Sequence, residues 1–109
     1  MEKIRVAING YGVIGKRVAD AVHLQEDMEL VGVCDVITDW RIQMAVLKKY
    51  PVFASDDMFK TKMNEAGINS SGTLNDLLAS SDIIVDCTPK KIAAQNIELY
   101  KKLGKKFIL

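Results

Sequence analysis

The chain alternates short apolar runs with segments whose apolar residues recur every three or four positions. Most of the runs are unbroken and rich in β-branched residues, which is typical of strands buried on both faces of a parallel sheet. They predict strands at residues 4–8, 30–34, 52–53, 83–87 and 106–109.

The periodic segments between these runs predict helices. The first begins at Val13 and directs one apolar stripe inward, made of Ile14, Val18, Ala21, Val22 and Leu24 or Gln25. The second is capped by Asp39, runs to about residue 49 and is ended by Pro51. Its expected inner residues are Ile42, Ala45, Val46 and Tyr50.

Three further helices are expected at residues 58–66, 74–79 and 92–103. Gly67 and Gly104 end the first and the last of these. Thr73 caps the middle one, with Asp76 three residues later as an acidic variant of the capping box. The chain ends just after an apolar strand, so we expect it to belong to a larger two-domain protein. The alternative is a natural terminus with residues 106–109 as an edge strand.

Composition narrows the class of protein. The 109 residues carry 15 Lys and Arg against 14 Asp and Glu, a net charge of +1, which gives no sign of nucleic-acid or membrane binding. Neither a signal peptide nor a membrane span is visible, and the two cysteines suit a reducing, cytoplasmic location.

The most informative motif is a glycine turn between the first strand and the first helix. It has the Gly-x-Gly-x-x-Gly spacing and comprises Asn9, Gly10, Tyr11, Gly12, Val13, Ile14 and Gly15. The first glycine permits the turn, the second lets a pyrophosphate approach the backbone, and the third lets the helix pack against the strand. The free amides near Val13 and Ile14 would face the phosphates. The pattern predicts a Rossmann-type α/β domain, an open and mostly parallel sheet with helices on both faces.

Asp35 follows Gly15 by twenty residues, at the end of the second strand. A carboxylate there accepts hydrogen bonds from the adenosine ribose and repels a 2′-phosphate, which favours NAD. Arg41, with Lys48 and Lys49 nearby, is the opposing signal, because it could pair with the 2′-phosphate of NADP. NAD is therefore the expected cofactor and NADP the alternative.

Thr88 and Pro89 follow a later strand, where they would flank the nicotinamide half of the cofactor; Lys90 and Lys91 next to them could contact a phosphate. We expect Cys87 to be a buried, inert thiol. We expect His23 on the surface, and Trp40 in packing or as a wall on the adenine side of the cofactor rather than in catalysis. No catalytic set and no metal-ligand spacing can be assembled, so this chain alone should not catalyse a reaction.

Residues 7–21, with the string Asn-Gly-Tyr-Gly-Val-Ile-Gly-Lys-Arg at residues 9–17, resemble the N-terminus of archaeal (type II) glyceraldehyde-3-phosphate dehydrogenases. Residues 27–33, 65–68, 72–78 and 81–89 agree in the same order, so the resemblance spans the chain. It differs at Asp35, where many members have a lysine suited to NADP, and at Lys90 and Lys91, where many have Gly-Gly.

The resemblance implies an enzyme, usually a tetramer, that oxidises glyceraldehyde 3-phosphate with phosphate and passes hydride to NAD(P). It also implies that the catalytic cysteine and histidine lie beyond residue 109. Two other interpretations stay open. One is a regulatory module that senses the nucleotide without catalysis, and the other is a different two-domain oxidoreductase, such as a semialdehyde dehydrogenase.

Overall fold

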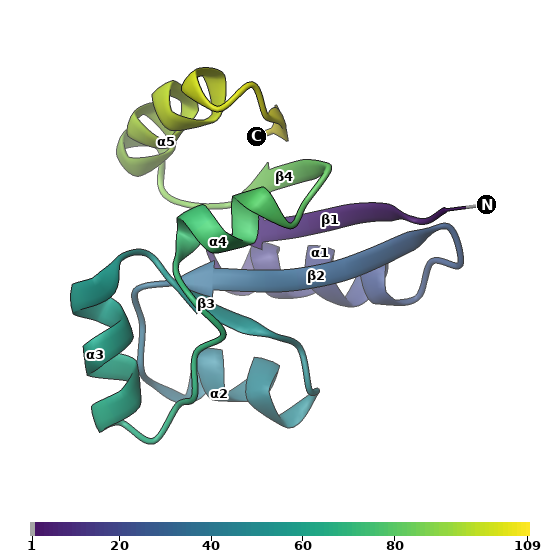
Figure 1. Cartoon of the computed structure of the whole chain (residues 1–109). Coiled ribbons are helices and arrows are strands. Elements are labelled where there is room, and N and C mark those ends of the chain that lie inside the picture. Colours follow the sequence, from purple (N-terminus) through teal and green to yellow (C-terminus); the bar gives the residue numbers. More distant parts are fainter. Residues whose placement is uncertain (1) are drawn as a thin grey trace.

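The computed structural model describes residues 2–109, which form one parallel sheet of five strands in the order β3-β2-β1-β4-β5 (Figure 1). The strands are β1 (Ile4–Asn9), β2 (Met28–Asp35), β3 (Val52–Ala54), β4 (Ile83–Asp86) and β5 (Lys106–Ile108). The helices are α1 (Val13–His23), α2 (Trp40–Leu47), α3 (Asp57–Glu65), α4 (Leu74–Ala79) and α5 (Lys90–Lys102). The predicted alternation of strands and helices is confirmed, with ends that differ by up to two residues.

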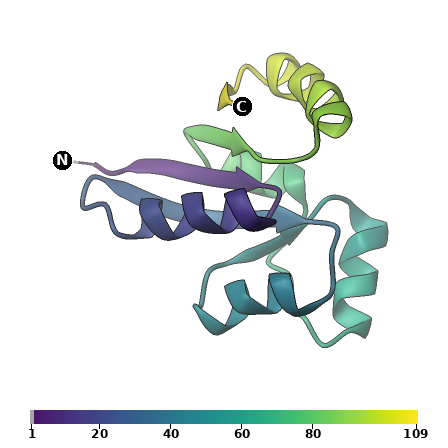
Figure 2. The ribbon, with the colours of Figure 1, turned by 180° about the vertical axis from the view of Figure 1, so that it is seen from behind.

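Helices cover both faces of the sheet, as expected. α1 and α2 lie on the face that Figure 2 turns toward the reader, and α4 lies on the opposite face. Two buried clusters correspond to these faces, and the inward side chains of β1 divide between them: Val6 and Ile8 pack with α1 and α2, and Ala7 packs with α4 and α5. Both faces of the central strand are therefore buried, which explains its unbroken apolar run.

The buried stripe of α1 differs from the predicted one. Ile14 and Leu24 are 62% and 78% exposed, and Ala21 is exposed as well, whereas Gly15, Ala19 and Val22 are buried. Gly15 must face β1 because the turn brings the two backbones into contact there. A helix advances by about 100° per residue, so that contact sets the phase and turns Ile14 outward.

The second helix ends earlier than predicted, at Leu47, and for a different reason. Lys49 adopts a φ of 63°, and the amide of Tyr50 donates to the carbonyl of Ala45 at 3.0 Å, which is a Schellman ending. Pro51 lies beyond this ending and does not cause it. Ile42, Ala45 and Tyr50 point inward as expected, but Val46 is 46% exposed.

The remaining helix starts follow local capping. Asp39 accepts a hydrogen bond from the amide of Arg41, and Thr73 and Asp76 form the predicted capping box. Asp56, which the sequence analysis did not identify, caps α3. Over residues 2–109 no helix combines the length and the apolar character that a membrane span requires.

Core packing on the α4 face leads to a stability prediction. Leu77 is fully buried among β1, β2 and α5, so Leu77→Ala should lower the free energy of unfolding by about 2–5 kcal/mol. The matched variant Leu47→Ala removes a side chain that is 75% exposed and should change it by less than about 0.5 kcal/mol. Urea unfolding followed by circular dichroism measures both. Equal losses would contradict the assigned packing of α4.

Candidate functional site

The glycine turn packs backbone against backbone. Gly10 has a φ of +97°, and a Cβ on it would lie 2.8 Å from the backbone of Cys87 and Thr88. A Cβ on Gly15 would lie 1.8 Å from the carbonyl oxygen of Gly10. Larger residues cannot occupy these two positions without moving β1, β4 or α1 apart. The turn therefore holds the start of α1 directly against the carboxyl end of the sheet.

Gly12 differs from its two neighbours. A Cβ on Gly12 would meet nothing within 4 Å, so its packing does not require glycine. Gly12 is the N-cap of α1 and no side chain caps the helix, so amides of the first turn have no side-chain partner. Val13 and Ile14 are 68% and 62% exposed beside it. The result is an open helix N-terminus, which favours an anionic group.

Asp35 is tied to the same turn. One carboxylate oxygen accepts from the amide of Tyr11 and the other from the amide of Val36, both at 2.6 Å. The side chain thus links the end of β2 to the glycine turn and stays half-buried at the cleft. Each oxygen keeps a further lone pair, so the carboxylate can still accept from a ligand hydroxyl.

Tyr11 contributes to the turn through its backbone. Its side chain is 1% exposed and packs in the core beneath α1 and α2, and burial raises the pKa of its hydroxyl. That hydroxyl has no hydrogen-bond partner among the described residues. Tyr11 therefore supports the turn through its backbone amide, which donates to Asp35, while its ring belongs to the core.

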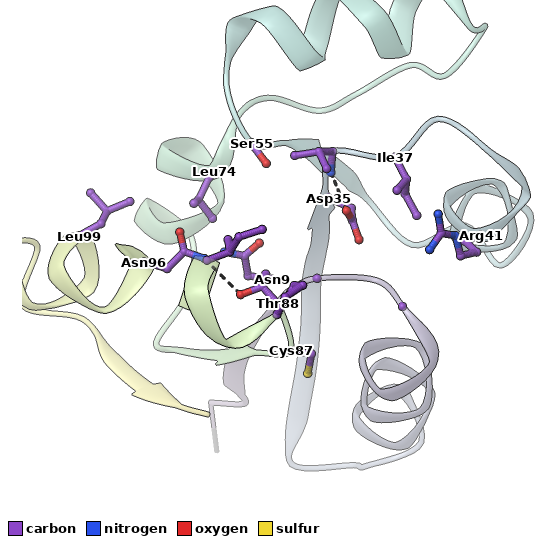
Figure 3. A pocket seen from close by; sticks show the side chains of 15 residues that line it. Asn9, Asp35, Ile37, Arg41, Ser55, Leu74, Cys87, Thr88, Asn96 and Leu99 are labelled. Atoms are coloured by element: carbon purple, nitrogen blue, oxygen red, sulfur yellow. Dashed lines mark hydrogen bonds between the residues drawn. The ribbon is translucent and has the colours of Figure 1, made fainter. Parts of the chain in front are cut away.

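A cleft of about 670 Å³ runs along the carboxyl ends of the strands (Figure 3). Its walls come from the glycine turn, the segment after β2, the end of β4 and the first turns of α5. Of the residues expected at the site, Asn9, Gly10, Gly12, Asp35, Thr88 and Pro89 line it. Val13 and Tyr11 instead line a smaller hollow on the other side of Gly12, together with Trp40 and Arg41.

The wall beside β4 is a buried polar network centred on Asp86, which is 4% exposed. Its Oδ1 accepts from the amide of Thr88 at 2.9 Å and from the Thr88 hydroxyl. Its Oδ2 accepts from the amide group of Asn96 at 3.1 Å and from the Tyr100 hydroxyl. The side-chain amide of Asn9 donates to the Tyr100 oxygen at 2.9 Å. The network joins β1, β4 and α5 at the cleft.

Several residues take positions that the sequence did not predict. Arg41 lines the cleft, but its guanidinium pairs with Asp39 at 2.8 Å, so it is not extended over Asp35. Trp40 is 68% exposed and does not pack in the core. Asn96, Ser55 and Leu74 line the cleft although the sequence analysis did not select them. Asn96 follows Asp86 by ten residues, and the helical phase of α5 was the only signal available for it.

The two thiols differ in burial. Burial raises the pKa of Cys34 to about 12. Cys87 is half-buried rather than fully buried and lines the cleft, and burial together with Asp86 raises the pKa of its thiol. It therefore stays protonated at neutral pH and is a poor nucleophile. Among residues 2–109, no group of three or more potential ligands could hold a metal ion.

The strand order, the glycine turn at the central strand and the cleft along the carboxyl edge define a dinucleotide-binding domain of the Rossmann type. Residues 4–109 match the family described as "Dihydrodipicolinate reductase, N-terminus". The chain belongs to this family, whose members are NAD(P)-binding Rossmann domains.

The chain is also similar to archaeal glyceraldehyde-3-phosphate dehydrogenases. It is 48% identical over 109 residues to the enzyme of Archaeoglobus fulgidus and 50% identical over 107 residues to that of Methanococcus maripaludis. These matches cover 99% and 97% of this chain but 32% of each relative, so the chain spans about a third of their length. A scyllo-inositol dehydrogenase from Lactobacillus casei shares the fold, with a TM-score of 0.64 and 19% identity over 97% of this chain and 27% of that one.

The contrast between Gly12 and Gly15 gives a paired prediction. Gly12→Ala should leave the unfolding midpoint unchanged but weaken NAD(P) binding at least about tenfold, because the added methyl group occupies the approach to the helix N-terminus. Gly15→Ala should lower both, because its methyl group overlaps the Gly10 carbonyl. Calorimetric titration and thermal unfolding of the two variants test this. A Gly12→Ala variant that binds like the wild type would contradict the assigned role of the turn.

Proposed function

We propose that this chain is the nucleotide-binding part of a glyceraldehyde-3-phosphate dehydrogenase. In this reaction the aldehyde is oxidised in the presence of phosphate to 1,3-bisphosphoglycerate, and the hydride passes to NAD(P). The observation that carries the proposal is the identity of about half of all positions, along nearly the whole chain, with relatives that bear that name. Membership of the family indicates a nucleotide-binding domain, which many enzymes share. The similarity to these relatives is what favours one particular enzyme.

The site residues receive the following roles in this proposal. The backbone of the turn, from Asn9 to Gly15, receives the pyrophosphate, with Gly12 giving access and the amides at Val13 and Ile14 donating to it. This step relies on the open N-terminus of α1, which no side chain caps. When bound, the cofactor accepts the hydride; this chain binds and orients it and contributes no residue to the covalent chemistry.

Asp35 and Thr88 would hold the two nucleosides. Asp35 accepts from the hydroxyls of the adenosine ribose, which favours NAD over NADP. Thr88 and Pro89 flank the nicotinamide half at the end of β4. The pairing of Arg41 with Asp39 supports the NAD preference, because that guanidinium is already engaged.

We also propose that the complete protein is a cytoplasmic homotetramer, as the resemblance to glyceraldehyde-3-phosphate dehydrogenases implies. Both cysteines are free thiols, which suits a reducing compartment. Sedimentation analysis of the complete gene product tests the assembly. A regulatory module without catalysis is not favoured, because the relatives are named as enzymes.

The activity prediction uses the complete gene product. Glyceraldehyde 3-phosphate, phosphate and NAD together should produce reduced nicotinamide, followed by absorbance, and omission of phosphate should slow the reaction sharply. As a control for the family description, the same protein should not reduce dihydrodipicolinate. Absence of turnover with both NAD and NADP would contradict the proposed reaction.

The cofactor prediction concerns Asp35. Asp35→Ala should weaken NAD binding by about tenfold, because the ribose loses its acceptor, and should leave NADP binding unchanged or tighter, because a repelling charge is removed. Calorimetric titration with each cofactor gives the ratio. An equal loss for both cofactors would mean that Asp35 acts only by holding the amide of Tyr11, and a clear NADP preference of the wild type would overturn its assigned role.

A further inference from the structure

The network around Asp86 has a fixed direction of hydrogen bonding. An ionised carboxylate only accepts, so the four groups in contact with Asp86 must all donate: the Thr88 amide, the Thr88 hydroxyl, the Asn96 amide group and the Tyr100 hydroxyl. Burial, together with the hydrogen bond to Asp86, raises the pKa of Tyr100, so its hydroxyl keeps the proton that it donates. Each of these groups therefore gives one proton to Asp86, and Asn96 keeps a second proton on Nδ2, which lies 3.5 Å from the Thr88 hydroxyl oxygen.

The same reasoning extends one step to Asn9. A phenolic hydroxyl has a single proton, and Tyr100 gives it to Asp86. Its oxygen must then accept from Asn9, which orients the Asn9 amide with Nδ2 toward Tyr100 at 2.9 Å. The orientation of Asn96 is fixed in the same way, because only its Nδ2 can meet a carboxylate oxygen.

What these side chains leave for a ligand is mainly a set of acceptors. Asn9, Thr88 and Asn96 all line the cleft, and Figure 3 shows Thr88 and Asn96 joined by the weak contact of 3.5 Å. Among residues 2–109, no donor contacts the Oδ1 atoms of Asn9 and Asn96. The Thr88 oxygen has already donated its proton to Asp86 and can only accept from a ligand. Of the side-chain protons of these three residues, only the second Nδ2 protons of Asn9 and Asn96 remain, so this wall of the cleft offers mainly lone pairs.

We propose that Asp86 is a positioning residue that sets the hydrogen-bond polarity of the side chains in this wall, so that they select a group rich in hydroxyl or amide protons. The inference rests on dinucleotide binding in the cleft. Asp35 is an acceptor at one end, the α1 N-terminus is a donor in the centre, and the Asp86-directed wall is an acceptor at the other end. That order matches a ribose, a pyrophosphate and a second nucleoside, so the wall receives the second nucleoside through its ribose hydroxyls or its carboxamide.

The variant Asp86→Asn tests this assignment. An asparagine has only one acceptor oxygen, and its amide group would point protons at hydroxyls that now donate, so the polarity of the wall must change. We expect NAD affinity to fall by about tenfold while AMP, which lacks the second nucleoside, binds within about twofold of the wild type. The matched control is Asp82→Asn, an exposed residue at the opposite end of β4 that pairs with Arg5. It should change neither affinity.

ADP-ribose has the second ribose of NAD but lacks the nicotinamide, so its affinity shows whether the wall binds the ribose hydroxyls or the carboxamide. If its affinity falls as much as that of NAD, the wall reads the ribose hydroxyls; if it is unchanged, the wall reads the carboxamide, and both outcomes support the proposal. Equal losses for NAD and AMP, or no loss for either, would overturn it. A wild-type protein that binds no NAD would instead contradict the proposed function.

A second variant covers the case in which Asp86→Asn does not fold. Thr88→Val removes one acceptor from the wall and leaves Asp86 with its contacts to Asn96 and Tyr100. It should reproduce the selective loss of NAD over AMP, measured by the same titrations. Unchanged NAD affinity in a folded Thr88→Val protein would exclude an acceptor role for this wall.

Discussion

The close approach of Gly15 to the carbonyl of Gly10 is the constraint on which the rest of the structure depends. No side chain fits between these two backbones, so α1 starts directly against the carboxyl end of β1. The contact fixes which side of α1 faces the sheet and therefore which residues are buried. It also brings the amide of Tyr11 within reach of Asp35, so that the second strand supports the turn of the first. One backbone contact thus determines the core packing of a helix and the geometry of the site.

The sequence predicted the strands well because a strand buried on both faces cannot carry polar side chains in its middle. It predicted the helix phases less well. In α1, the apolar character of Ile14 and Leu24 suggested burial, but the position of Gly15 sets the phase and leaves both exposed. In α2, the left-handed conformation of Lys49 ends the helix before Pro51 can. Such helix ends depend on backbone hydrogen bonds, which the residue types at these positions do not predict.

The site residues also divide into those that local sequence predicts and those that depend on packing. The position of the glycine turn, Asp35 and Thr88 at the carboxyl edge of the sheet could be predicted because each lies within a short motif at the end of a strand. Asn96 and Tyr100 were not predicted because they contact Asp86 from α5, ten and fourteen residues further along the chain. Only the packing of α5 against β4 brings them together, and no short motif records that packing. Tyr11 shows the reverse case: it stands inside the motif, yet its ring belongs to the core and only its amide serves the turn.

Asp35, which lines the cleft, and Asp86, which is buried behind its wall, accept from different kinds of partner. Asp35 accepts from backbone amides, whose direction the fold already dictates, so its charge remains directed at the cleft. Asp86 accepts mainly from side chains that rotate freely elsewhere, and it removes that freedom by taking their protons. A half-buried carboxylate at the cleft can contact a ligand directly, whereas a buried one acts on the ligand through the groups that it orients. The second arrangement places neutral acceptors beside the ligand, and neutral acceptors can bind the hydroxyls of a nucleoside without adding a second negative charge near the pyrophosphate.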